Sequence, residues 1–209
     1  NADTLVGGTV ADTLAGGSDN DTITGGAGND ELTGGDGVDT FNVDEDVDTI
    51  TDLGTDGGAD IVVVSAGATA NATVVNAAGY TATDDSSNAG DFNVTVDEGV
   101  NAGATVSFAT LSGDNGVSLT GSSKNNVLIG SAQDDTIVGG DGNDMIAGGN
   151  GNDSLSGGNN DDTFVFATSR QLGSDTSVNG GAGTDTIQMS SGDVDVIFED
   201  TDFSKVREV

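Results

Sequence analysis

The sequence predicts an all-β chain in which blocks of parallel β-roll, a form of β-solenoid, flank an irregular β segment. Three observations lead to this prediction: an apolar residue recurs at every ninth position in two blocks, a glycine pair lies in most intervals, and an aspartate precedes most of these apolar residues by two positions. One apolar residue in nine is too sparse for a helix face, which needs spacings of three and four. Internal repetition of this kind is typical of solenoids.

The first roll block is predicted over residues 1–53. Its apolar positions are Leu5, Leu14, Ile23, Leu32, Phe41 and Ile50, and its aspartates are Asp3, Asp12, Asp21, Asp30, Asp39 and Asp48. Segments such as Thr22-Ile23-Thr24 suit short strands whose centre points inward, and the glycine-rich stretches suit tight turns with positive φ. Strand, turn, strand and turn make a coil of about eighteen residues, so stacked coils place the apolar residues in two inner columns.

The same spacing returns in a second block, predicted over residues 117–188. Its apolar positions are Leu119, Leu128, Ile137, Ile146, Leu155 and Phe164, and residues 180–188 hold one late copy. A loop inserted at 167–178 separates that copy from the others. Residues 54–116 do not repeat, but their alternating apolar residues predict strands, as at Phe92, Val94 and Val96. Residues 189–209 are expected to begin a further β segment.

The charge of the chain calls for a cation. Asp and Glu number 36 against four Lys and Arg, which gives a net charge of −32. Such a composition fits either a disordered acidic chain or a fold that depends on cations; the constant phase of the aspartates favours the second. Stacking would place Asp12 over Asp30 and Asp21 over Asp39, where like charges need a counter-charge. With neither His nor Cys in the chain, oxygen ligands predict several Ca²⁺ ions rather than zinc or copper.

The repeat Gly-Gly-x-Gly-x-Asp-x-apolar-x, best seen at residues 25–33, resembles that of the repeats-in-toxin (RTX) family. The resemblance covers residues 1–52, 117–166 and 180–188. It implies that each calcium ion lies between two stacked turns, each of which gives its Asp and two backbone carbonyls. Four sites carry over: Gly8, Val10 and Asp12 with Gly25, Ala27 and Asp30; Gly17, Asp19 and Asp21 with Gly34, Asp36 and Asp39; Ser131, Gln133 and Asp135 with Gly148, Asn150 and Asp153; and Gly140, Gly142 and Asp144 with Gly157, Asn159 and Asp162.

Departures from the motif qualify this assignment. Asn126 stands where the repeat has Asp, so we expect a weaker site there. The fourth-position glycine is replaced by Val10, Asp19, Gln133 and Asn160, which predicts strain in those turns. Residues 43–48 lose their glycines, so no site is expected between Asp30 and Asp48.

The resemblance implies export through a type I channel and folding outside the cell in calcium. We expect a secreted, extracellular or cell-surface protein of structural function, a surface layer or an adhesin. Its partners would be calcium ions, identical neighbouring chains or a cell-surface polysaccharide. The alternative is the carrier module of a secreted enzyme or toxin, which an upstream catalytic domain in the parent gene would indicate.

Several functions are not expected. Catalysis lacks its usual nucleophile and base partners, because the chain has no His or Cys, so we expect no enzyme. The four basic residues are scattered, which argues against nucleic-acid binding. No apolar run approaches the roughly 18 residues of a transmembrane segment.

Overall fold

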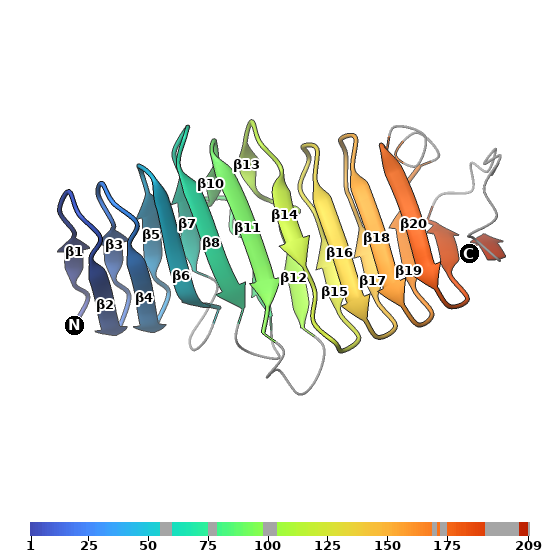
Figure 1. Cartoon of the computed structure of the whole chain (residues 1–209), viewed down its shortest axis with the longest axis horizontal. Helices are drawn as coiled ribbons and strands as arrows, with labels where there is room; N and C mark the ends of the chain where they lie inside the picture. The colour runs from blue at the N-terminus through green and yellow to red at the C-terminus, as the bar shows by residue number, and fades with distance from the viewer. Residues whose placement is uncertain are drawn as a thin grey trace.

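A computed structural model describes residues 1–54, 60–74, 79–97, 104–168, 171 and 175–190, and the backbone of 205–208. These residues form a parallel β-solenoid whose strands lie side by side along the long axis of the molecule (Figure 1). The all-β, parallel β-roll prediction is therefore confirmed.

The strands form three parallel sheets. Sheet A has the order β1 (Thr4–Val6), β3 (Thr22–Thr24), β5 (Thr40–Val43), β7 (Ile61–Val64), β10 (Ser87–Asn88) and β13 (Ser112–Gly113). Sheet B has the order β2 (Thr13–Ser18), β4 (Glu31–Asp36), β6 (Val47–Leu53), β8 (Thr69–Val74), β11 (Asp91–Val96), β14 (Val117–Thr120), β16 (Thr136–Asp141), β18 (Ser154–Asn159) and β20 (Ser177–Ala182). Sheet C has the order β22 (Lys205–Glu208), β21 (Thr186–Met189), β19 (Thr163–Phe166), β17 (Met145–Ala147), β15 (Val127–Ile129), β12 (Thr105–Ser107) and β9 (Tyr80–Thr81).

Sheet B runs the length of the solenoid, but the sheet that faces it changes. Strands β1 to β6 alternate between sheets A and B, whereas β16 to β21 alternate between sheets B and C. Between them, the chain visits A, B and C in turn, so each central coil has three faces. Ala70, Phe92 and Val117 stack in sheet B, so these coils take 22 and 25 residues. The described residues of 60–116, predicted as a β segment between the rolls, thus form a wider continuation of the same solenoid.

The stacking of the rolls follows the nine-residue spacing. Leu14 pairs with Leu32 and Leu32 with Ile50, each one coil further along sheet B. In sheet C, Leu128, Ile146 and Phe164 stack in the same way. Register in a parallel sheet is fixed where one face is buried, and here the inward-facing apolar side chains of the strands set it.

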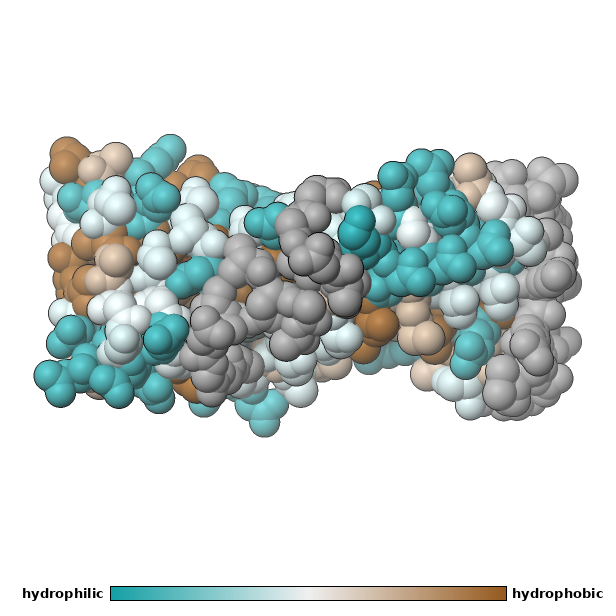
Figure 2. Space-filling view, turned by 90° about the horizontal axis from the view of Figure 1, so that it is seen from below, coloured by the Kyte–Doolittle hydropathy of each residue, from teal (hydrophilic) through white to brown (hydrophobic). Residues whose placement is uncertain are grey.

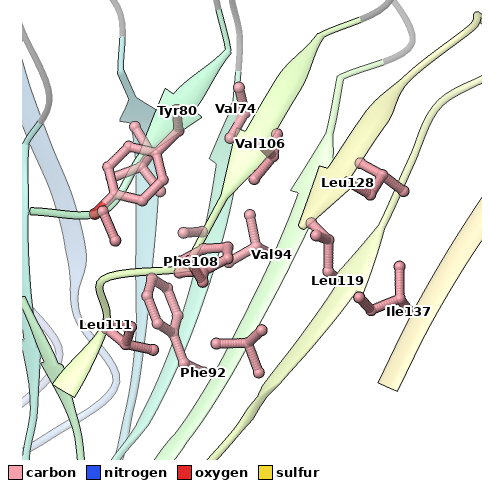
Figure 3. Close-up of a cluster of buried hydrophobic side chains, with 14 of the residues drawn as sticks. Val74, Tyr80, Phe92, Val94, Val106, Phe108, Leu111, Leu119, Leu128 and Ile137 are labelled. Carbon is pink, nitrogen blue, oxygen red and sulfur yellow. The ribbon is translucent and has the colours of Figure 1, made fainter. Parts of the chain in front are cut away.

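The central coils have the richest core. Phe108 lies between Tyr80 and Phe92, with ring centroids 5.5 and 5.4 Å apart (Figure 3). All three rings are buried, as are the corner residues Ala68 and Leu111. These coils therefore add a cluster of packed aromatic rings to the core of the solenoid.

Three predicted boundaries can be compared with the strands. Strand β14 begins at Val117, the first residue predicted for the second block, but it belongs to a coil with three faces. The loop predicted over 167–178 ends earlier, because β20 begins at Ser177. Most of the segment predicted over 189–209 lies outside the described residues, although the backbone of β22 pairs in parallel with β21. No helix among the described residues is long and apolar enough to span a membrane.

Candidate calcium sites in the stacked turns

The turns of neighbouring coils are joined through their aspartates. The backbone N–H of Asp12 donates to Oδ1 of Asp30 at 2.8 Å, and that of Asp21 donates to Oδ1 of Asp39 at 2.7 Å. The same bond recurs between Asp144 and Asp162 at 2.9 Å. Each carboxylate thus receives a hydrogen bond from the coil before it, and the aspartates form ladders along both turn edges of the rolls.

The second oxygen of most ladder carboxylates is buried without a partner. Among the described residues, nine aspartate Oδ2 atoms have no hydrogen-bond partner: those of Asp21, Asp30, Asp39, Asp48, Asp144, Asp153, Asp162, Asp175 and Asp185. Buried polar atoms are almost always satisfied by protein, water or an ion. A recurring row of unsatisfied carboxylate oxygens therefore indicates a missing cationic partner.

Burial makes these carboxylates costly in the charged form. Desolvation raises the pKa of Asp153 to about 7 and those of Asp48 and Asp162 to about 6. The backbone hydrogen bonds from the preceding coil lower these values, but they do not offset burial. No lysine or arginine among the described side chains forms an ion pair with a ladder aspartate, so this part of the chain provides the ladder with no counter-charge.

The glycine pair makes room for the carboxylate. A Cβ on Gly148 would collide with Oδ2 of Asp153, and one on Gly157 with Oδ2 of Asp162. The next residue of the pair, Gly149, has a φ of 111° and approaches the carbonyl of Ser131 in the preceding coil. The first glycine is therefore required by the carboxylate that lies over it, and the second by the backbone of the turn.

The model of the RTX calcium-binding nonapeptide repeat, four copies long, matches residues 1–32, 15–50, 112–146, 120–155 and 138–167. Together these matches cover residues 1–50 and 112–167, about half of the chain. The chain belongs to the RTX calcium-binding nonapeptide repeat family. A comparison with curated proteins found none that matches it.

All four aspartate pairs expected of an RTX chain come together in the structure. Asp135 and Asp153 are joined at 2.9 Å in the same way as the three pairs above. The pairs differ in their free oxygens. In the Asp21–Asp39 and Asp144–Asp162 pairs, both Oδ2 atoms lack a hydrogen-bond partner. In the Asp12–Asp30 pair only the Oδ2 of Asp30 lacks one, and in the Asp135–Asp153 pair only that of Asp153 does. In those, Oδ2 of the first aspartate accepts a bond from its own turn, from Gly8 N–H or Ser131 N–H, both at 2.6 Å.

The backbone carbonyls of the predicted sites belong to these same turns. The carbonyl of Gly8 also accepts a hydrogen bond from the N–H of Ala27 at 3.1 Å, which ties two predicted ligands of one site together across the coils. Carbonyl ligands are needed, since no group of three or more carboxylates among the described residues could hold a metal by itself. The carbonyl assignments stay predictions.

The RTX ladders extend beyond the predicted residues. Asp48, for which no site was expected, accepts a bond from Asp30 N–H at 3.1 Å and keeps a free Oδ2. Asp175 and Asp185 join Asp153 and Asp162 in the same way, at 3.3 and 3.0 Å. Sequence reasoning did not place Asp175, because the insertion before it breaks the nine-residue spacing. The copy at residues 180–188 did contain Asp185.

Replacement of the fourth-position glycine has two outcomes. Asp19 and Asn160 take positive φ values of 77° and 78°, a conformation that Asp and Asn tolerate better than other residues. Val10 and Gln133 do not adopt positive φ. Strain is thus confined to residues that accept it.

The free oxygens fit calcium. Buried carboxylate and carbonyl oxygens in flexible turns are the ligands that Ca²⁺ prefers, and it takes six to eight of them. Calcium held by the paired aspartates would supply the counter-charge that the described side chains do not provide. Figure 2 views the edge at which the strands of sheet B end, where hydrophilic residues gather over the second roll.

Proposed function

We propose that this chain is the extracellular calcium-binding β-roll module of a structural surface protein that is exported by a type I system and folds on calcium. The observation that carries the proposal is the row of nine buried, unpartnered Oδ2 atoms. Without an ion these charges oppose the compact roll, and bound calcium removes that cost because metal binding is coupled to folding.

The magnitudes support a switch. An ion present at ten times its dissociation constant adds about 1.4 kcal/mol to stability. Four such ions add about 5–6 kcal/mol, which is comparable to the whole stability of a typical domain. Low calcium inside the cell would keep the rolls open for export, and the higher calcium outside would close them.

The structural assignment, to a surface layer or an adhesin, has separate support. The solenoid is a continuous rod with a net charge of −32, so calcium between rods would draw identical chains together. The lack of His and Cys leaves a catalytic role without its usual groups, and we propose that the module is not an enzyme. A cell-surface polysaccharide is the other partner that an adhesin of this kind would hold.

Assembly distinguishes this proposal from its alternative. Calcium is added to the chain in chelator, and light scattering and electron microscopy follow association, with magnesium as the control. Ordered arrays that form with calcium alone are the expected result. A chain that binds calcium and stays monomeric at every concentration would contradict assembly, and would favour the carrier module of a secreted enzyme or toxin.

A further inference from the structure

The unpartnered carboxylate oxygens are confined to the two ends of the solenoid. Four belong to residues 21–48 and five to residues 144–185. Among the described residues of 60–135, the only buried side-chain atom without a partner is the Thr83 hydroxyl, which is neutral. Three residues in this stretch, Asp60, Asn126 and Asp135, still occupy ladder positions.

The two ladder aspartates of this stretch are satisfied by the chain itself. In Asp60, Oδ1 accepts from Asp39 N–H at 3.0 Å and Oδ2 from Gly54 N–H at 2.8 Å. In Asp135, Oδ1 accepts from Val117 N–H at 2.7 Å and Oδ2 from Ser131 N–H at 2.6 Å. Backbone N–H groups thus donate to both oxygens of Asp60 and of Asp135, so neither aspartate has an oxygen without a partner.

The side-chain amide of Asn126 makes hydrogen bonds at the place where an aspartate would hold an ion. Its Nδ2 donates to the carbonyl of Lys124 at 2.6 Å, and its Oδ1 accepts from Ala104 N–H at 3.3 Å. Its backbone N–H keeps the ladder bond to Oδ1 of Asp144 at 2.7 Å. A donor therefore lies where an aspartate would place an unpartnered oxygen, and it satisfies the carbonyl at the fourth position of the turn.

The corners between these coils also close without carboxylates. Ala68 N–H donates to Ser65 O at 3.1 Å, and Leu111 N–H donates to Phe108 O at 2.9 Å. Phe108 packs on Tyr80 and Phe92 directly behind these corners. The central coils are held by a conventional apolar core, and a core of this kind needs no cation.

We propose that the described residues of 60–135 form a calcium-independent segment, which stays folded in chelator and offers each roll a finished coil on which to stack. This inference rests on the proposed folding of the rolls by calcium. Each coil of a solenoid is stabilised by its neighbours. Strands β7 and β8 present such an edge to β5 and β6, and β14 and β15 present one to β16 and β17. Calcium then extends the fold outward from the centre in both directions.

Hydrogen exchange of the full chain, read by mass spectrometry in EDTA and in calcium, tests this division. In EDTA the amides of β8, β11 and β14 are expected to be protected, while those of β2, β4, β18 and β19 exchange freely; calcium then protects all of them. Free exchange throughout in EDTA, with full protection in calcium, would overturn the central segment but leave the folding of the rolls by calcium intact. Full protection throughout in EDTA would contradict both.

The variant Asn126→Asp tests the boundary of the segment. It removes the donor to Lys124, so it is expected to bind one more calcium ion than the wild type and to lose protection of β14 and β15 in EDTA. The control is Asn125→Asp, which introduces the same charge at an exposed neighbour whose Oδ1 accepts from Asn143 N–H at 2.9 Å. An Asn126→Asp chain with wild-type ion count and wild-type protection would show that the amide does not stand in for an ion.

Discussion

Asp144→Asn removes one charge from the second roll, at a position where the structure predicts how many calcium ions are lost. Asp144 pairs with Asp162 in the next coil. On its other side lies Asn126, whose amide is bonded to the turn carbonyl of Lys124. Asp144 therefore contributes to one site only. The substitution keeps the Oδ1 that accepts from Asn126 N–H and changes only the unpartnered Oδ2.

We expect Asp144→Asn to bind one calcium ion fewer than the wild type. At a calcium concentration ten times the dissociation constant, loss of one ion lowers the free energy of unfolding by about 1.4 kcal/mol. In EDTA the variant should be no less stable than the wild type, because a buried unpaired charge has been removed. The calcium-dependent part of the stability therefore falls while the calcium-free part does not.

Isothermal titration calorimetry counts the ions, and urea denaturation in calcium and in EDTA gives the two free energies. The matched control is Asp141→Asn, which makes the same change of charge at an exposed side chain three residues away. The control should keep the wild-type ion count. An Asp144→Asn chain that binds as many ions as the wild type, with the same affinity, would refute the assignment of Asp144 as a ligand.

Three further predictions follow from burial and packing. Gly148→Ala should raise the calcium midpoint of folding, followed by circular dichroism, since its Cβ would collide with Oδ2 of Asp153; an unchanged midpoint would contradict the close approach. The raised pKa values of Asp153, about 7, and Asp48 and Asp162, about 6, mean that the folded rolls bind more protons than the unfolded chain, so in EDTA their stability should rise as the pH falls from about 7 towards 4. Acid should conversely raise the calcium midpoint, because protons compete for the same oxygens, and the opposite trend in either titration would contradict these shifts. Phe92→Ala should cost about 3–5 kcal/mol in urea denaturation whether or not calcium is present, since its ring packs in the central core; a cost seen only in calcium would contradict a calcium-independent centre.

The rolls could be predicted from the sequence because the nine-residue spacing determines the positions of the strands, the positions of the turns and the stacking of the coils. Leu14, Leu32 and Ile50 lie at intervals of one coil, and their aspartates keep the same phase, so the pairing of Asp12 with Asp30 followed directly. No comparable period marks the central coils. Their corners are closed by residues such as Ala68 and Leu111, which carry no turn motif of their own.

The chemistry of individual turns could not be read from the repeat. Asp135 and Asp153 occupy the same position of the motif, yet only Asp153 keeps an Oδ2 without a partner, because the backbone N–H of Ser131 donates to Oδ2 of Asp135. The hydroxyl of Ser131 donates to Oδ1 of the same aspartate. Because Asn stands at position 126 where the repeat has Asp, the sequence predicted a weaker calcium site there. The bond from Asn126 to Lys124 shows a turn closed by the chain alone.

A calcium titration followed by circular dichroism, from EDTA to about 10 mM calcium with magnesium in parallel, tests the central claim most directly, since extracellular calcium modules bind in the range of about 0.1–1 mM. We expect a partial β signal in EDTA and a cooperative gain with calcium, but not with magnesium, as the rolls fold. A full β signal in EDTA, or an equal gain with magnesium, would contradict the claim that calcium on the aspartate ladders folds the rolls.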